Sequence, residues 1–303
     1  MKKFIKILLI VGVVFILVGG IIFTVAMCVD GWDFSKLSNR VVEQKTLEIV
    51  DEVDSVTRVK VIADTADVNI LYHDEQQITV DCYDIKSDKG ELLRQVTATI
   101  DGNELEIKDQ TVKNQLFSIG FENTRITVKL PRAKVVSLKV EVSTGDVKIG
   151  EKGEVYTFNN LNLNTSTGQI KLDGDLNCNE LFVTTSTGKV CVNGKLNLIK
   201  MEVEGSTSDL IINATVIASE IEVDHSTGDV ICNAFITAEK INVETSTGDV
   251  TLRLLGVQSD YTYTYDIDTG KSNIFPTYGG SKQVNVETST GDAYIYFELQ
   301  LHS

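Results

Sequence analysis

The stretch Ser226-Thr227-Gly228-Asp229-Val230 recurs twenty residues later as Ser246-Thr247-Gly248-Asp249-Val250. Related units fill the second half of the 303-residue chain. The third position of each unit falls at Gly145, Gly168, Gly188, Ser208, Gly228, Gly248, Gly270 and Gly291. In the regular middle of this series the spacing is 20 residues. A fixed period of this length is the signature of a repeat architecture, so we expect one coil of a solenoid for each unit.

Apolar and polar residues alternate on both sides of each unit. Apolar residues stand seven and five positions before the glycine, as at Leu181 and Val183, and again two and four positions after it, as at Val190 and Val192. Alternation with a period of two is typical of strands, whereas a helical repeat would follow the helical period. We therefore predict an all-β fold, a right-handed parallel β-helix of about eight ~20-residue coils. Each strand should pair with its equivalent one coil away, at about 4.8 Å.

The repeated unit is predicted to form a corner of each coil. Glycine adopts the backbone conformations that a sharp turn requires, and Ser, Thr and Asp favour turns. The predicted turn glycines are Gly145, Gly168, Gly188, Gly228, Gly248, Gly270 and Gly291. Ser208 predicts a locally different turn. A catalytic serine is disfavoured because no histidine recurs beside these serines to act as a base, and His225 is expected to pack against the corner.

The N-terminus predicts a membrane segment. Residues 1–6 contain three lysines, and the 23 residues from Ile7 to Val29 carry no charge. As a helix this stretch is long enough to cross a hydrocarbon core of roughly 30 Å. Lysines before the span predict a single-pass protein of the cell membrane with a cytoplasmic N-terminus and the bulk of the chain outside. A cleaved signal peptide is the alternative, although its apolar part is usually shorter.

We expect five segments along the chain. They are a cytoplasmic tail at 1–6, a transmembrane signal anchor at 7–29, a stalk at 30–45, a β-rich entry module at 46–131 and the repeat β-helix at 132–303. The entry module contains a degenerate unit, Asp64-Thr65-Ala66-Asp67, and a hairpin signal at Asp101-Gly102-Asn103. Its expected purpose is to cap the array, because a solenoid otherwise begins with an open strand edge.

Charge and cysteine content restrict the classes of partner. The net charge of −15 argues against nucleic acid, whose phosphates require lysine and arginine. The five cysteines show no Cys-x-x-Cys spacing and predict neither a zinc site nor a redox motif. On the repeat lattice Cys178 and Cys232 point inward and Cys191 outward, so we expect free thiols.

The repeats resemble a family of uncharacterised bacterial surface proteins described as adhesins with β-strand repeats. The resemblance rests on the Ser-Thr-Gly-Asp-Val units at 143–147, 226–230 and 246–250, on Ile126-Thr-Val-Lys-Leu-Pro131, and on the final Ser289-Thr-Gly-Asp-Ala293. It covers about residues 50–297. It implies a β-strand repeat fold and a surface location, with some members linked to cell-envelope stress systems, and it implies no catalytic residue.

Acidic residues recur on one outward face, four positions before the third residue of the unit. The last five of them are Glu204, Asp224, Glu244, Asp266 and Glu287. Carboxylates stacked about 5 Å apart repel one another unless cations screen or bridge them. We consider a strip that binds Ca²⁺ weakly or takes a cationic ligand, with a solvated face that only confers solubility as the alternative.

A second outward position, three residues after the glycine, is apolar in the middle of the array. Ile211 and Ile231 occupy it, and Phe235 extends the patch. Exposed apolar patches often mark interfaces, so self-association or a partner surface is one interpretation. The β-propensity of isoleucine alone is the other.

These patterns favour a membrane-anchored, extracytoplasmic β-helix that acts as a cell-surface binding, adhesin-like or envelope-associated module. The expected partners are the membrane, through residues 7–29, and a cell-wall glycan or protein, with a homo-oligomer as a further option. A scaffold or sensor of an envelope stress-response complex is the first alternative. A polysaccharide-acting enzyme is the second, and it is disfavoured because the short regular coils leave no long loops to build a cleft. We therefore expect no enzyme, and no cofactor beyond weakly bound Ca²⁺.

Overall fold

The computed structural model describes residues 12, 15–21, 24–25, 28, 40–50, 53–113, 124–132 and 134–299. Residues 15–21 are helical, and the chain from residue 40 onward is mainly strand and turn. No helix within the described ranges is long and apolar enough to span a bilayer. The expected tail at 1–6 and much of the expected anchor at 7–29 lie outside the described residues.

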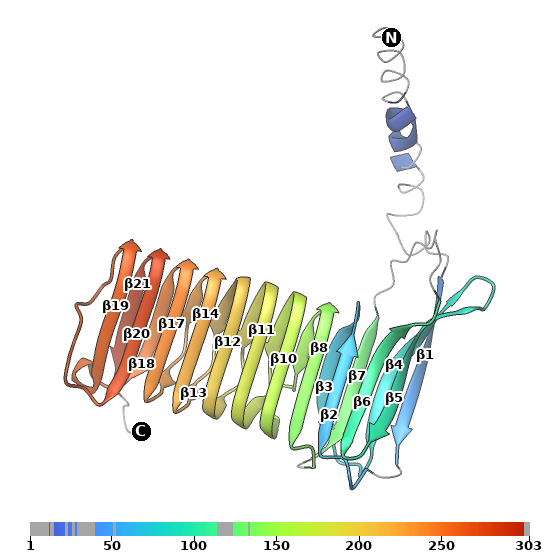
Figure 1. Ribbon diagram of the computed structural model, residues 1–303, viewed down its shortest axis with the longest axis horizontal. Coiled ribbons are helices and arrows are strands. Elements are labelled where there is room, and N and C mark those ends of the chain that lie inside the picture. The colour runs from blue at the N-terminus through green and yellow to red at the C-terminus, as the bar shows by residue number, and fades with distance from the viewer. Residues whose placement is uncertain are drawn as a thin grey trace.

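The body of the molecule is an all-β solenoid (Figure 1). Its entry part contains β1 (Arg40–Ile49), β2 (Arg58–Ala63), β3 (Asp67–His73), β4 (Ile78–Ser87), β5 (Leu92–Asp101), β6 (Glu104–Thr111) and β7 (Arg125–Pro131). The repeat part contains β8 (Ser137–Thr144), β9 (Val147–Ile149), β10 (Val155–Leu172), β11 (Asp175–Val192), β12 (Leu196–Ile212), β13 (Val216–Ile217), β14 (Glu220–Thr227), β15 (Val230–Cys232), β16 (Ile236–Thr237), β17 (Lys240–Thr247), β18 (Val250–Leu255), the 3-10 helix η2 (Gln258–Asp260), β19 (Tyr261–Thr269), β20 (Lys282–Thr290) and β21 (Ala293–Glu298). Because β1 begins at Arg40, the prediction that the stalk extends to residue 45 is wrong at its end.

Equivalent strands of the repeat part pair in parallel, one coil apart. Leu161 lies opposite Leu181, and Leu181 lies opposite Met201. The same column continues through Ile221 and Ile241. All five side chains are buried, whereas their neighbours along each strand are more accessible. The parallel stacking and the inward positions predicted for these coils are confirmed.

The corners require glycine for two reasons. The seven predicted turn glycines have φ between 139° and 157°, a region that other residues rarely adopt. A Cβ atom at Gly188 would also overlap the backbone carbonyl oxygen of Gly168 in the adjacent coil. The aspartate of the unit joins coils as well, since Asp229 Oδ1 accepts a 2.9 Å hydrogen bond from the backbone N–H of Asp249. Each corner is therefore a stacking contact in addition to a turn.

The C-terminal coils do not stack in chain order. Ile241 of β17 pairs with Val284 of β20, and Val284 pairs on its other side with Tyr263 of β19. Strand β20 therefore lies between β17 and β19, and β19 forms the far end of the array (Figure 1). Equivalent strands pair one coil apart here too, as predicted, but the coils are not stacked in the order of the copies in the sequence. The units at Gly270 and Gly291 both fit the repeat pattern, so periodicity alone could not tell which of them stacks on the coil of Gly248.

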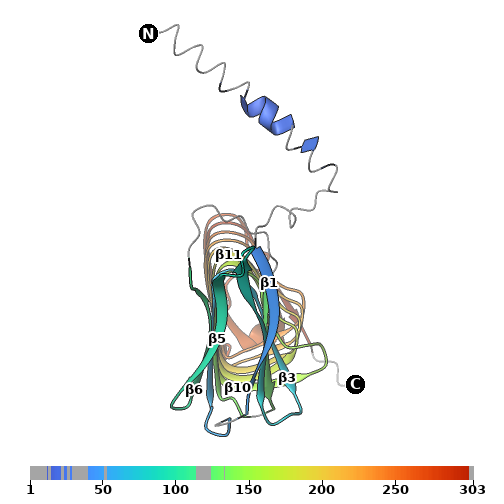
Figure 2. The same ribbon diagram turned by 90° about the vertical axis from the view of Figure 1, so that its right-hand side faces the viewer.

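The N-terminal end is built by a similar excursion. Strands β2 and β3 stack on β8 and β9, and the degenerate unit places Ala66 against Gly145. Between them in sequence, β4 to β7 add an outer layer in which β6 pairs with β2 and β7 with β3. Strands β5 and β6 form the antiparallel hairpin predicted at Asp101-Gly102-Asn103. In the view along the solenoid, β1 and β5 lie at the end that faces the viewer (Figure 2).

A buried polar network holds this outer layer to the first coil. The Asp109 carboxylate is buried and accepts hydrogen bonds from Tyr83 Oη at 2.9 Å and from Arg94 Nε at 2.6 Å. Arg94 also lies 3.2 Å from the carboxylate of Asp64 in the degenerate unit. Burial raises the pKa of Asp109, although Arg94 opposes this shift. Buried charges of this kind require such partners.

Candidate functional site: an acidic groove

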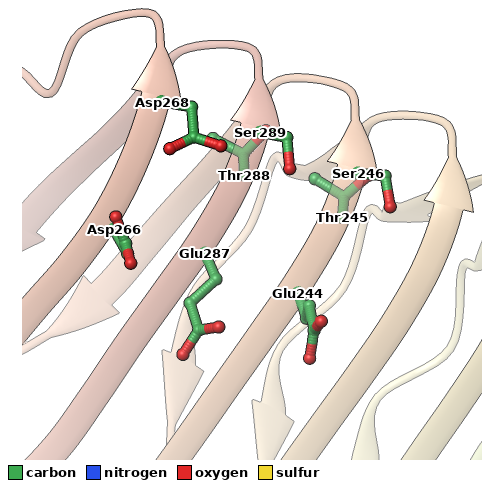
Figure 3. A pocket seen from close by; sticks show the side chains of 8 residues that line it. All are labelled: Glu244, Thr245, Ser246, Asp266, Asp268, Glu287, Thr288 and Ser289. Carbon is green, nitrogen blue, oxygen red and sulfur yellow. The ribbon is translucent and has the colours of Figure 1, made fainter.

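The five outward carboxylates form one continuous row. Glu204 pairs with Asp224, Asp224 with Glu244, Glu244 with Glu287, and Glu287 with Asp266. All five side chains are exposed. Figure 3 shows Glu287 between Glu244 and Asp266, on three neighbouring strands. We call this row the acidic ladder. The predicted residues are brought together, but the last two stand in the reverse of their chain order.

Three hollows follow the acidic ladder along the solenoid. Their volumes are about 110, 240 and 320 Å³. The first and second share Glu244, and the second and third share Glu204 and Asp224, so together they form one shallow channel. Corner hydroxyls line it beside the carboxylates, including those of Ser246 and Ser289 (Figure 3). We call this channel the acidic groove.

The acidic ladder is not neutralised by neighbouring side chains. Lys200 bridges Glu202 and Glu222 at 2.8 Å each, on the same face. Its ammonium holds the pKa of the Glu222 carboxyl below its usual range. In the described part of the chain, no lysine or arginine forms an ion pair with the five carboxylates of the ladder. The groove therefore carries uncompensated negative charge.

The ladder does not form a compact metal centre. Among the described residues, no group of three or more His, Cys, Asp or Glu side chains could hold a metal ion. In parallel pairing the carboxylates follow one another at about 4.8 Å along a line. Such an arrangement suits a linear ligand with repeated positive charges better than a single ion.

The predicted apolar patch is less exposed than the acidic groove. Ile211 pairs with Ile231, and both side chains are half-buried, as is Phe235. Ile217 is the more accessible residue nearby, with half of its surface exposed. Cys191 is paired with Ile211 and is half-buried, whereas Cys178 and Cys232 are buried. All five cysteines are free thiols.

A cluster that sequence reasoning did not connect lies beneath the groove. Gly205 pairs with His225, and a Cβ at Gly205 would meet the Ser208 hydroxyl and the imidazole ring. His225 is buried, and neither ring nitrogen has a hydrogen-bond partner within the described structure. Burial lowers the pKa of His225, and Asp224 and Asp209 only partly offset this effect. The sequence held a signal for this cluster, because Gly205, Ser208 and His225 all depart from the repeat and occupy neighbouring positions in two adjacent coils.

Comparison with known proteins identifies the kind of fold. The sequence profile of the Toastrack DUF4097 family matches residues 56–297. No curated protein matches the chain.

Solved structures share the architecture. A "putative adhesin" from Bacteroides fragilis has a TM-score of 0.52 at 14% identity, covering 84% of this chain and 97% of its own. A second "putative adhesin", from Parabacteroides distasonis, has a TM-score of 0.56 at 12% identity, with coverage of 84% and 97%. A "putative lipid binding protein" from the same species has a TM-score of 0.56 at 16% identity, with coverage of 85% and 98%. At these identities the likeness concerns the fold alone.

Proposed function

The chain belongs to the Toastrack DUF4097 family, and on this basis we propose that it is a surface-binding module whose acidic groove takes a linear polycation. The observation that carries this proposal is the acidic ladder, five exposed carboxylates in continuous register with no ion pair in the described part of the chain. Like charges at this spacing repel one another, so a cationic ligand relieves repulsion as it binds. The structural neighbours described as adhesins agree with a binding module.

The groove geometry favours an extended ligand. Its three hollows are shallow and contiguous; carboxylates line all three, and Ser and Thr hydroxyls line two of them. A polymer that carries ammonium groups, whether a basic peptide or an amino sugar, would present charge to several coils at once. Contacts of this kind are electrostatic and screened by salt. Binding should therefore weaken steeply as salt is added.

Poly-lysine is a direct probe of the proposal. We expect the full chain to bind poly-lysine and not poly-glutamate, with affinity falling as NaCl rises. The variant Glu204→Gln/Asp224→Asn/Glu244→Gln should lose at least about tenfold in affinity, about 1.4 kcal/mol. The matched control Glu151→Gln/Glu180→Gln/Glu239→Gln removes the same charge outside the groove and should bind nearly as well. Equal losses in the two variants would assign the effect to net charge and refute the groove.

We also propose that residues 7–29 anchor this module in the cell membrane, with residues 40–299 on the extracytoplasmic side. The uncharged stretch and the lysines before it support this orientation. Protease added to intact cells should cleave the repeat part, and alkaline extraction should leave the chain in the membrane fraction. Release into the soluble fraction would contradict the anchor. Co-purification with envelope stress-response components would favour the scaffold alternative instead.

A further inference from the structure

The two ends of the solenoid differ in how the outermost strands are covered. At the C-terminal end the chain covers its own outermost strands. Thr277 forms an antiparallel bridge with Tyr263 of β19, with N–H···O distances of 3.0 and 2.9 Å. The Asn273 side chain accepts from the Ile295 N–H at 2.8 Å and donates to the Ile295 carbonyl at 2.9 Å, as a peptide group of a neighbouring strand would. At that end, Asn273 and Thr277 thus satisfy outer backbone groups of β21 and β19.

At the other end, strand β1 is the edge strand of the part of the chain that the structure describes. Within the described residues β4 is its only partner, and the pairing runs without interruption from Arg40 to Ile49. Protein edges are usually protected by proline, by a bulge or by a projecting lysine. Strand β1 contains no proline and no bulge, and Lys45 is held by Asp84 of β4. Over residues 41–49 the edge is therefore long and regular, and no other described strand pairs with it.

A groove adjoins this edge. It has a volume of about 490 Å³ and lies between residues 45–49 of β1 and residues 96–98 of β5. Leu47, Ile49 and Ala98 pack against the hydrophobic core from this side but remain only half-buried. Five strand residues span roughly 17 Å. The groove therefore has the length of a short strand, with apolar surface on its floor and, along one side, backbone groups of β1 that no other described strand pairs.

We propose that this open end binds an extended polypeptide segment, which adds to β1 as a further strand and places alternate apolar side chains in the groove. Unpaired N–H and C=O groups of an edge strand are satisfied by another main chain, and pockets for alternate side chains add selectivity. A lipid chain would fill the apolar floor but leave those backbone groups unpaired. The chain's own closure of the opposite end uses the same kind of contact.

The test uses the full chain in lipid nanodiscs and the peptide Ac-Lys-Val-Thr-Val-Thr-Val-Lys-NH2. Hydrogen exchange read by mass spectrometry should slow by about tenfold or more across residues 41–49 when peptide is added, as β-strand addition requires. A peptide with the same side chains and N-methylated backbone should give no protection. Ala98→Trp, which fills the groove, should reduce peptide binding by about tenfold or more. Thr99→Trp, at the exposed next position of β5, is the matched control and should bind normally.

Three results would overturn the proposal. The first is unchanged exchange at residues 41–49 under saturating peptide. The second is competition by a short-chain phosphatidylcholine without any amide protection, which would assign the groove to lipid. The third is protection of β1 that rises with protein concentration alone, which would assign the edge to a second copy of the chain. If Ala98→Trp lowers the melting temperature, Leu47→Asn replaces it, because that change alters the groove floor without adding volume.

Discussion

At the scale of single residues, the corner glycines serve both backbone conformation and coil stacking, and the two can be separated. Gly153 has φ of 89° with open space around its Cβ position, whereas a Cβ at Gly188 would overlap the adjacent coil. Gly153→Ala should cost about 1–2 kcal/mol of unfolding free energy from strain. Gly188→Ala should cost about 1–3 kcal/mol more, because the stack must open. Urea unfolding measures both variants, and equal losses would contradict the stacking explanation.

We expect His225 to make the free energy of unfolding depend on pH. Its folded pKa is lowered by burial from 6.5, so the unfolded chain binds a proton more readily. The stability associated with a neutral, buried His225 is fully present above about pH 6.5 and is lost as the pH falls below that value. His225→Thr should flatten the slope of unfolding free energy between about pH 7.5 and about pH 5.5. His73 and His302 are present in both the unaltered chain and the variant. If the two proteins show the same slope of unfolding free energy against pH, His225 is not its source.

At the scale of elements, closure of the C-terminal end depends on the side chain of Asn273. Asn273→Ala removes both contacts with Ile295 of β21. We expect a loss of about 1–2 kcal/mol and faster exchange of the Ile295 amide. Asn242→Ala, at an outward position of β17, is the control and should change neither quantity appreciably. Normal protection of Ile295 in the Asn273 variant would show that the backbone closes this end unaided.

The elements also show where sequence reasoning succeeds. The columns from Leu161 to Ile241 were predictable because two periods, of two and twenty residues, agree over several coils. The position of β20 next to β17 was not predictable. Tyr263 of β19 and Val284 of β20 both fit the repeat pattern, and only packing decides which of the two strands pairs with β17. The acidic ladder was found as a set but in the wrong order for this reason. The Tyr83–Arg94–Asp109 network has no regular spacing, so no pattern connected its members.

At the scale of the whole molecule, the acidic ladder opposes folding. Neighbouring carboxylates on adjacent strands cost roughly 0.2–1 kcal/mol per pair at low salt. The unfolding free energy of the unaltered chain should therefore rise as NaCl is added, since salt screens this repulsion. Glu204→Gln/Asp224→Asn/Glu244→Gln should be more stable at low salt and respond less to NaCl. A response equal to that of Glu151→Gln/Glu180→Gln/Glu239→Gln would assign the effect to net charge.

The position of β20 between β17 and β19 constrains the order in which the chain can assemble during synthesis. The N-terminal coils can add one upon another as they emerge, because each finds its partner already in place. Strand β19 emerges before β20 yet rests on it. The final coils therefore need residues 282–290, and a chain halted near residue 280 would lack the partner that β17 and β19 share. The last coils of the solenoid can thus form only after β20 has been synthesised.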